Sequence, residues 1–228
     1  MVNRDLIESV SISDLLKFGG KRPDQATGAV SDAPSARGSD AIVPSKALPK
    51  FIAALSSQEA PVLLDFGAVI GSNVAFFGEN LGCKLFIEDL ATDLDRHTRA
   101  GTREALPGTF AKRFSQTDGS VDGVLCWDIF DFLERPAAQA LAKEVVRVLR
   151  PGGVAMGFFC SSPVNRSSFT KFEIVEESSL RHRPHSGTGG PKYVLQNRDI
   201  IRMFDGLTVA DSFLLKSNTR EMLLRKRA

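Results

Sequence analysis

Residues 144–159 read EVVRVLRPGGVAMGFF, and this stretch indicates the fold more clearly than any other part of the chain. Its first half completes a helix predicted over residues 137–149, in which the apolar side chains recur at helical spacing and form one stripe. The Pro-Gly-Gly that follows ends the helix, because proline and glycine both disfavour its continuation. The apolar run over residues 154–159 then predicts a strand that is buried on both faces.

The same alternation of short strands and helices occurs upstream. Three apolar runs predict buried strands: PVLLDF at residues 61–66, CKLFIE at 83–88 and VDGVLCW at 121–127. Residues 72–81 predict a helix between the first two strands, since their apolar positions follow helical spacing. Strands that alternate with helices in this way favour right-handed crossovers and a parallel sheet covered by helices on both faces.

The C-terminal part follows a different pattern. Two strand-like runs, residues 207–215 and 219–224, are joined by only three residues. A helical crossover needs a longer connection, so these two strands are predicted to form an antiparallel hairpin. The sheet is therefore expected to be parallel except at its last strand.

The N-terminal residues 1–45 are predicted to be an extension of a domain that spans residues 46–228. Residues 4–17 have the apolar spacing of a short helix, whereas residues 18–45 are rich in glycine, proline, serine, aspartate and alanine. A segment of that composition buries too little apolar surface to offset the entropy lost on ordering. It is interpreted as a flexible linker, a mobile lid or a disordered tail.

Composition narrows the class of protein. The chain has 228 residues, 43% of them hydrophobic, and its 29 Lys+Arg against 27 Asp+Glu give no reason to expect nucleic acid as a partner. The three cysteines are widely spaced within apolar runs, which suits a reducing compartment. No signal-peptide pattern and no run of about 20 apolar residues occurs, so a cytoplasmic location away from membranes is predicted.

Four segments carry a resemblance to the class I S-adenosylmethionine-dependent methyltransferases over about residues 46–228. They are LLDFGAVIGSN (63–73), LFIEDL (85–90), DGSVDGVLCWDIFDFL (118–133) and the stretch quoted first. The resemblance implies a Rossmann-like three-layer α/β sandwich with a mostly parallel seven-stranded sheet and an antiparallel C-terminal hairpin. It also implies S-adenosylmethionine as the cofactor.

The first of these segments resembles the family's glycine-rich cofactor loop. By that resemblance the loop contains Asp65, Gly67, Val69, Gly71 and Asn73. Glycines allow the backbone to approach a ligand and to adopt positive φ, and the following helix N-terminus suits a carboxylate. Val69 stands where the middle glycine is expected, and a β-branched side chain resists positive φ. Either the loop has a variant conformation that binds the cofactor, or this side chain blocks the pocket.

Acidic residues follow the second predicted strand. The family uses an acid at this place to accept hydrogen bonds from both ribose hydroxyls, and Glu88 or Asp89 is expected to do so here. The family often has a further acid before the fourth strand that binds the adenine amino group. Residues 110–114 read FAKRF, so apolar contacts and backbone groups are expected to hold the adenine instead.

The segment after the fourth strand resembles the part of the family that faces the methyl acceptor. Trp127, Asp128 and Phe130 are expected there, although tryptophan also commonly packs in a core and aspartate commonly caps a helix. His182 and His185 follow a strand-like KFEIVEE (171–177). No further ligand accompanies them at metal-binding spacing, so a loop over the mouth of the site is favoured and no metal is predicted.

Three functions fit these features. The first is methyl transfer from S-adenosylmethionine to an acceptor that the sequence does not identify. The second is a catalytically silent domain of the same fold that serves in binding or assembly. The third is a nicotinamide-dependent dehydrogenase, since an acid after the second strand also suits the ribose of NAD, but the C-terminal hairpin argues against it. Neither the acceptor nor the oligomeric state follows from the sequence.

Overall fold

The computed structural model describes residues 42–185, 187 and 190–227. The helix predicted over residues 4–17 and most of the predicted linker lie outside the described residues. The helices are α1 (Leu48–Ser56), α2 (Gly71–Ala75), α3 (Leu90–Ala100), α4 (Leu106–Arg113), α5 (Arg135–Val148) and α6 (Asn197–Met203), with a π-helical turn η2 (Phe76–Asn80) and 3₁₀ turns η3 (Arg103–Ala105) and η4 (Ile129–Phe132). The strands are β1 (Ile42–Pro44), β2 (Val62–Asp65), β3 (Lys84–Ile87), β4 (Val121–Trp127), β5 (Leu149–Cys160), β6 (Val164–Ser167), β7 (Thr170–Glu176), β8 (Ser179–Pro184), β9 (Gly190–Lys192), β10 (Leu207–Leu214) and β11 (Thr219–Lys226).

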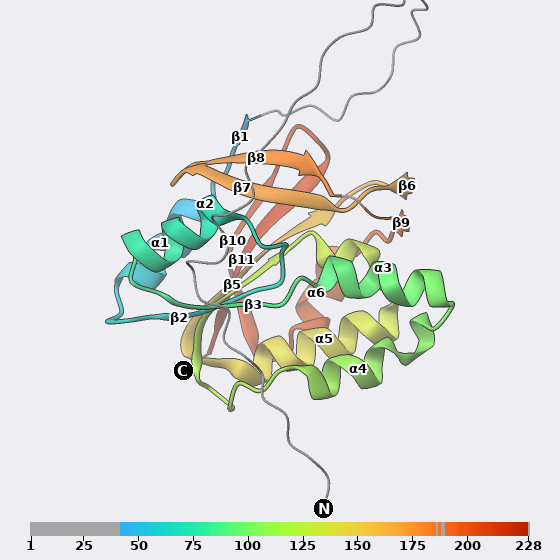
Figure 1. The fold of residues 1–228 in the computed structure, drawn as a ribbon, viewed down its shortest axis with the longest axis horizontal. Helices are drawn as coiled ribbons and strands as arrows, with labels where there is room; N and C mark the ends of the chain where they lie inside the picture. The colour runs from blue at the N-terminus through green and yellow to red at the C-terminus, as the bar shows by residue number, and fades with distance from the viewer. Residues whose placement is uncertain (1–41, 186, 188–189, 228) are drawn as a thin grey trace, which may run out of the picture. The chain divides into compact units, whose positions relative to one another are not determined.

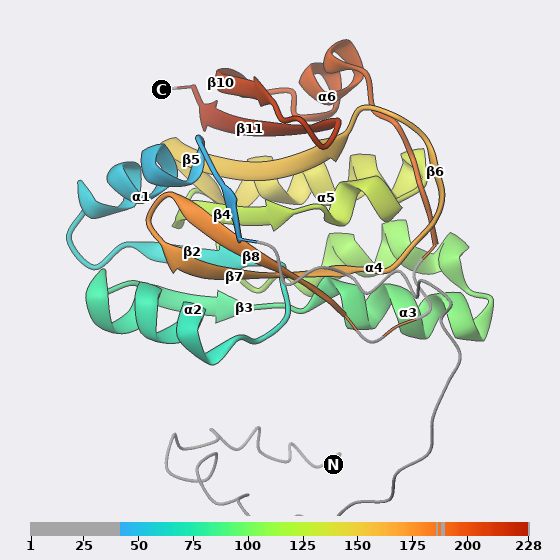
Figure 2. The ribbon, with the colours of Figure 1, turned by 90° about the horizontal axis from the view of Figure 1, so that it is seen from above.

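The central sheet has the strand order β10-β11-β5-β4-β2-β3. Figure 2 shows β10 and β11 at one end of this sheet and β3 at the other. Strands β3, β2, β4 and β5 are parallel, and β11 is antiparallel to both of its neighbours, β5 and β10. The predicted parallel sheet with an antiparallel C-terminal hairpin is therefore confirmed.

Within the described residues this sheet has six strands, one fewer than the predicted seven. The strand-like segment KFEIVEE does form a strand, β7, but it pairs with β8 in a separate antiparallel sheet of order β1-β8-β7. Strand β7 covers one face of the central sheet instead, because its side chains Phe172 and Ile174 are buried against that sheet. Between β3 and β4 the described chain forms α3, η3 and α4, so no strand adds to the sheet there. Strand β1, which falls in the predicted linker, completes the small sheet by pairing with β8.

The central sheet separates two hydrophobic clusters, and Figure 1 shows the layers that cover it. Helices α3, α4, α5 and α6 pack on one face. The other face is covered by α1, the α2–η2 segment and the small sheet. Successive residues of a strand point to opposite faces, so Leu63 belongs to the second cluster and Leu64 to the first. No helix in the described part of the chain is long and apolar enough to cross a membrane.

Strand β5 begins earlier than the sequence indicates. The helix α5 ends at Val148, and the strand starts directly at Leu149 instead of at residue 154. Pairing with β4 shifts register between Leu149 and Val154, and Gly152 has φ +77° within this bulge. Glycine adopts that conformation without strain, so the Pro-Gly-Gly segment ends the helix and also continues as an irregular strand.

Candidate functional site

The carboxyl ends of β2, β3 and β4 lie side by side, because these strands are parallel neighbours in the sheet. Asp65 ends β2, Trp127 ends β4, and Glu88 follows β3 directly. Ligands of open α/β sheets bind at this edge. The topology therefore brings three of the sequence-predicted site residues to one place.

Asp65 joins the end of β2 to the end of β4. Its Oδ1 accepts a hydrogen bond from Trp127 Nε1 at 2.6 Å and another from the Gly67 backbone N–H at 2.8 Å. The carboxyl group is buried, and burial raises the pKa of Asp65 to about 6 although both hydrogen bonds oppose the shift. A Cβ on Gly67 would lie 2.7 Å from Trp127 Nε1, so this position requires glycine. Asp65, Gly67 and Trp127 form one packed unit.

Trp127 has an uncommon backbone conformation for a bulky residue, with φ +48°. Its indole ring is buried and stacks on Phe172, with ring centroids 5.0 Å apart and 3° between the planes. Trp127 therefore packs in the core, one of the two roles considered from the sequence, and it also lines the small cavity at the strand ends. Strain of this kind persists only where the surrounding structure enforces it.

The rest of the glycine-rich loop does not converge on this unit. Val69 is 67% exposed and is not among the described residues with positive φ, so the conformational conflict predicted for it does not arise. A Cβ on Gly71 would meet nothing within 4 Å. Asn73 is buried and binds β7 instead, donating to Phe172 O and accepting from Ile174 N, each at 2.8 Å. Its role in this structure is to hold the small sheet.

The two acids after β3 have different partners. Glu88 Oε2 accepts from Arg113 Nε at 2.8 Å, and Arg113 also pairs with Asp93. Asp89 is the N-cap of α3, where it accepts from Thr92 N at 3.2 Å and from Thr92 Oγ1 at 2.9 Å. Glu88 thus pairs with Arg113 on α4, whereas Asp89 caps its own helix and also lies 4.0 Å from His185.

An ion-paired group follows β4 that sequence reasoning missed. Lys192 Nζ lies 2.9 Å from Asp128 Oδ2 and 3.2 Å from Asp131 Oδ2. The Asp131 carboxyl is almost fully buried, which raises its pKa to about 6, and it accepts from Cys160 N at 2.9 Å. The spacing of the two aspartates is visible in the sequence, but no local signal connects them with a lysine in the distant β9.

Two expectations for this segment are wrong. Asp128 precedes η4 but makes no side-chain capping hydrogen bond, because its carboxylate is turned to Lys192. Phe130 does not face the site: it is fully buried, and its ring centroid lies 5.0 Å from that of Phe204 on the α6 side of the sheet. Phe130 belongs to the hydrophobic cluster between the central sheet and α5, and this packing accounts for its position.

The cavity at the strand ends is small. It has a volume of about 20 Å³ and is bounded by Gly67 and Trp127 from the sheet and by Phe169, Thr170 and His185 from the β7–β8 hairpin and its flanks. A cavity of that size has room for roughly one water molecule, whereas ligand pockets measure about 300–1,000 Å³. The residue types at this edge suit a nucleoside cofactor, but the β7–β8 hairpin and its flanks leave no room for one in this structure.

His182 and His185 are not brought together by the fold. His182 lines a different cavity from the one that His185 lines, and no cluster of three metal-ligating side chains occurs in the part of the chain that the structure describes. His185 lies 4.0 Å from Asp89 and closes the cavity at the strand ends. The expected surface loop is wrong for His182, which lies within β8, and the side chain of His185 is nearly buried.

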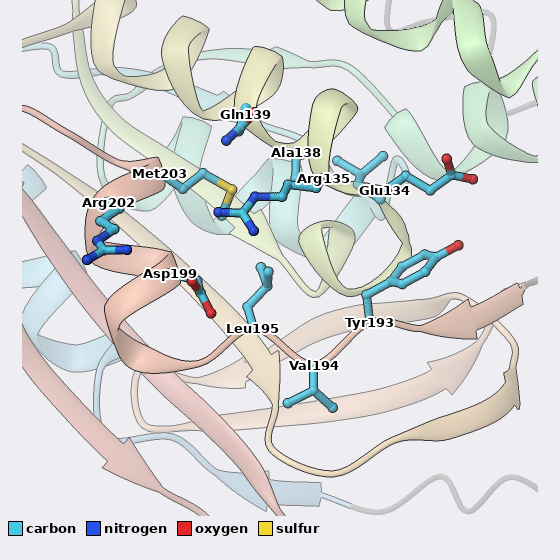
Figure 3. A pocket seen from close by; sticks show the side chains of 11 residues that line it. Glu134, Arg135, Ala138, Gln139, Tyr193, Val194, Leu195, Asp199, Arg202 and Met203 are labelled. Atoms are coloured by element: carbon cyan, nitrogen blue, oxygen red, sulfur yellow. The ribbon is translucent and has the colours of Figure 1, made fainter.

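A larger cavity of about 310 Å³ lies between the start of α5, the segment after β9 and α6 (Figure 3). Arg135 and Arg202 line it together with Glu134 and Asp199, so its charges balance. It shares no lining residue with the cavity at the strand ends.

Residues 64–157 match a family model described as a methyltransferase domain. No curated protein sequence matches the chain. Among solved structures, an S-adenosylmethionine-dependent methyltransferase from Mesorhizobium loti is similar with a TM-score of 0.50 at 12% identity, over 79% of this chain and 96% of that one. At this identity the likeness shows the fold.

Two further solved structures have lower scores. The 1,6-didemethyltoxoflavin-N1-methyltransferase of Burkholderia thailandensis, solved with 1,6-didemethyltoxoflavin and S-adenosylhomocysteine, has a TM-score of 0.46 and 17% identity over 80% of this chain and 79% of that one. The CcbJ methyltransferase of Streptomyces caelestis has a TM-score of 0.45 and 16% identity over 79% and 88%.

Proposed function

We propose that this chain, whose residues 64–157 match a methyltransferase-domain model, transfers the methyl group of S-adenosylmethionine to an acceptor. The observation that supports the proposal is the closeness of two segments in the sheet. The glycine turn after β2 and the acid after β3 lie at the same sheet edge, inside the region that matches the family model.

S-adenosylmethionine supplies an activated methyl group on a good leaving group. The protein then needs chiefly to hold donor and acceptor in line, and such positioning contributes several kcal/mol without an acid or a base. Gly67 has no side chain to shield its backbone from a ligand, and the place that a Cβ would take is filled by Trp127 and Asp65. Glu88 accepts the ribose hydroxyls in this proposal, and for that its carboxylate exchanges Arg113 for the ligand.

Binding also requires the β7–β8 hairpin to move. Phe169 and His185, which flank the hairpin, line the small cavity, so a nucleoside enters only when they withdraw. The two flanks are tied together, since the His185 N–H donates to Phe169 O at 2.8 Å. We therefore expect the hairpin and both flanks to open as one unit.

A second candidate function is a catalytically silent domain that serves in binding or assembly. Two observations favour it: the cavity of about 20 Å³ at the strand ends, and the ion pair between Glu88 and Arg113. In this alternative the hairpin stays closed and the sheet edge never receives a cofactor.

Calorimetric titration of the full chain with S-adenosylhomocysteine separates the two. Binding at micromolar concentration is expected for the transferase. The absence of heat at millimolar ligand would reject the transferase and support the silent domain. Hydrogen exchange in the same samples adds a structural result, since faster exchange in β7 and β8 on binding is expected if the hairpin opens.

A further inference from the structure

The cavity of about 310 Å³ between the start of α5, the segment after β9 and α6 has the size of a ligand pocket (Figure 3). Ligand pockets begin at about 300 Å³, and a cavity of about 150 Å³ accepts one benzene ring. The space therefore suits one ring together with a small polar head group. In the described chain this cavity and the one at the strand ends share no lining residue, so a ligand here leaves the strand ends free.

The floor of this cavity is apolar and continuous with the core. Leu133 and Ala138 are buried, and Leu195 and Met203 are half-buried against the same hydrophobic cluster. An apolar group that covers these side chains is favoured, because apolar surface then leaves the water. The thioether of Met203 makes favourable contacts with aromatic rings in particular.

Three charged groups around this floor have no ionic partner. Arg135 on α5 and both Asp199 and Arg202 on α6 line the cavity, and within the part of the chain that the structure describes none of them makes an ion pair. Opposite charges three positions apart on a helix commonly pair, yet Asp199 and Arg202 do not. Each of the three groups is therefore able to pair with a ligand.

The fourth charged group of the cavity is already engaged. Glu134 Oε1 lies 3.8 Å from Arg103 Nε, and Figure 3 shows the side chains of Glu134 and Arg135 extending in opposite directions. Two cations and one anion remain. An anionic ligand would face Asp199 without a compensating charge, and a cationic ligand would face two arginines, so a ligand that carries both charges fits best.

The arginines also favour particular groups on that ligand. A guanidinium presents its N–H donors in a planar fork that matches a carboxylate, whereas an aspartate accepts from an ammonium group. Arginine stacks well on aromatic rings, and Figure 3 shows the Arg135 guanidinium beside Met203, whose sulfur has the same preference.

We propose that this cavity binds a free α-amino acid with an aromatic side chain. Arg135 and Arg202 donate to its carboxylate, and Asp199 accepts from its ammonium group. The ring covers Leu195 and Met203. This binding site goes beyond the transferase function and does not depend on it, because no lining residue of the strand-end cavity takes part.

L-Phenylalanine is the probe, and two molecules that each lack one of its charges are the controls. 3-Phenylpropanoate has no ammonium group, and phenethylamine has no carboxylate. In calorimetric titrations of the full chain each should bind about tenfold more weakly than phenylalanine, because each leaves a charged group of the cavity unpaired. No heat with millimolar phenylalanine, or three affinities within about threefold of one another, would overturn the proposal.

Substitutions on α6 assign the two charges separately. Asp199→Asn should weaken phenylalanine binding about tenfold and should not weaken 3-phenylpropanoate binding. Arg202→Gln should weaken both and leave phenethylamine unchanged. Arg198→Gln, at an exposed position of the same helix outside the cavity, is the matched control and should alter none of the three. Losses that are equal for all three ligands would reject the charge assignment.

Methyl NMR locates the bound ring. With ¹³C-methyl-labelled methionine in the full chain, phenylalanine should shift the signal of Met203, because a ring current acts only on nearby nuclei. The signal of Met156, which is buried on the other face of the sheet, should stay in place. Met203→Leu identifies the Met203 signal by its disappearance. Phenylalanine that binds without shifting this signal lies elsewhere, and the cavity assignment is then wrong.

A competition titration separates this site from the proposed cofactor site. S-adenosylhomocysteine also carries an amino-acid group, so it is titrated into the chain with and without saturating phenylalanine. Its affinity should be the same in both titrations. Displacement of one ligand by the other would reject a separate amino-acid site. A chain that binds phenylalanine at Met203 but does not bind S-adenosylhomocysteine would reject the transferase and leave this site standing.

Discussion

Single residues at the strand ends combine two tasks in this protein. Asp65 is buried at the edge where ligands of such sheets bind, yet its Oδ1 already accepts hydrogen bonds from Gly67 and Trp127. Glu88 is the acid expected at the ribose, yet it pairs with Arg113. Each side chain therefore contributes to the closed structure as well as to the proposed cofactor site, and substitutions can separate the two tasks.

Asp65→Asn should change how stability depends on pH. The pKa of Asp65 is raised to about 6 in the folded state, so its protonation stabilises the fold below the unfolded pKa, and that stabilisation is lost as pH rises through about 6. A shift of about two pKa units corresponds to roughly 3 kcal/mol. Urea unfolding should show the wild type losing up to this amount relative to Asp65→Asn between pH 4 and pH 7. A difference that does not vary with pH would contradict the buried, ionisable carboxyl.

Glu88→Gln and Asp89→Ala form a matched pair. Hydrogen bonds to a charged acceptor contribute about 1.5–3 kcal/mol, so Glu88→Gln should weaken S-adenosylhomocysteine binding about tenfold to a hundredfold. Its melting temperature should change little, because a partly exposed ion pair contributes at most about 1 kcal/mol. Asp89→Ala should lower the melting temperature and leave the affinity nearly unchanged, since it removes a helix cap worth about 1 kcal/mol. Calorimetry and thermal unfolding measure both, and a larger affinity loss in Asp89→Ala would transfer the ribose role to Asp89.

Among the elements, the β7–β8 hairpin decides whether the sheet edge is open. The central strands and their helices carry the proposed binding residues, while the hairpin and its flanks supply the groups that fill the space. Asn73 on α2, which belongs to the segment that resembles the cofactor loop, holds the middle of β7 through two hydrogen bonds to Phe172 and Ile174.

Phe169→Ala tests the hairpin as a closing element. Phe169 is 3% exposed, and its ring centroid lies 4.6 Å from that of Phe132. Its removal should lower stability, as buried Phe→Ala changes cost about 3–5 kcal/mol, while S-adenosylhomocysteine binds more tightly because opening becomes easier. Phe110→Ala, a fully buried position on α4 away from this cavity, is the control and should lower stability alone. Weaker binding in Phe169→Ala would instead make Phe169 part of the ligand pocket.

At the scale of the whole domain, its first and last described segments are joined by a buried acid. Glu221 on β11 is 0% exposed, and its carboxylate accepts from the Ser45 hydroxyl and, at 2.9 Å, from Lys46 N. The Ser45 hydroxyl oxygen in turn accepts from Leu48 N at 3.0 Å at the start of α1. The final strand thereby orients the first helix, which covers β4 and β5.

Glu221→Ala should destabilise the entire domain. It leaves the Ser45 and Lys46 donors unsatisfied in a buried place, and each such group costs about 1–3 kcal/mol. Glu221→Gln keeps an acceptor and should cost less. Urea unfolding monitored by far-ultraviolet circular dichroism and by the fluorescence of Trp127, the single tryptophan, should shift together for both probes. A transition that moves for only one probe would show that the acid supports α1 alone.

Local sequence patterns were sufficient for the order and type of most elements of the central sheet. The apolar runs that end at Asp65 and at Trp127 are strands, and the parallel order that places their carboxyl ends together follows from the alternation with helices. Periodicity and turn chemistry act over a few residues, and for that reason one sequence reveals them. The resemblance to methyltransferases rested on the same short segments.

Only the tertiary structure decided what the predicted site residues touch. Glu88 and Arg113 are 25 positions apart, and Asp128 and Lys192 are 64 apart, so no local pattern pairs them. The hairpin that closes the cavity and brings His182 beside Asp128 depends on how β7 packs across the sheet. Many acidic and basic side chains could pair with one another, and which of them do so depends on which surfaces come into contact when the chain packs.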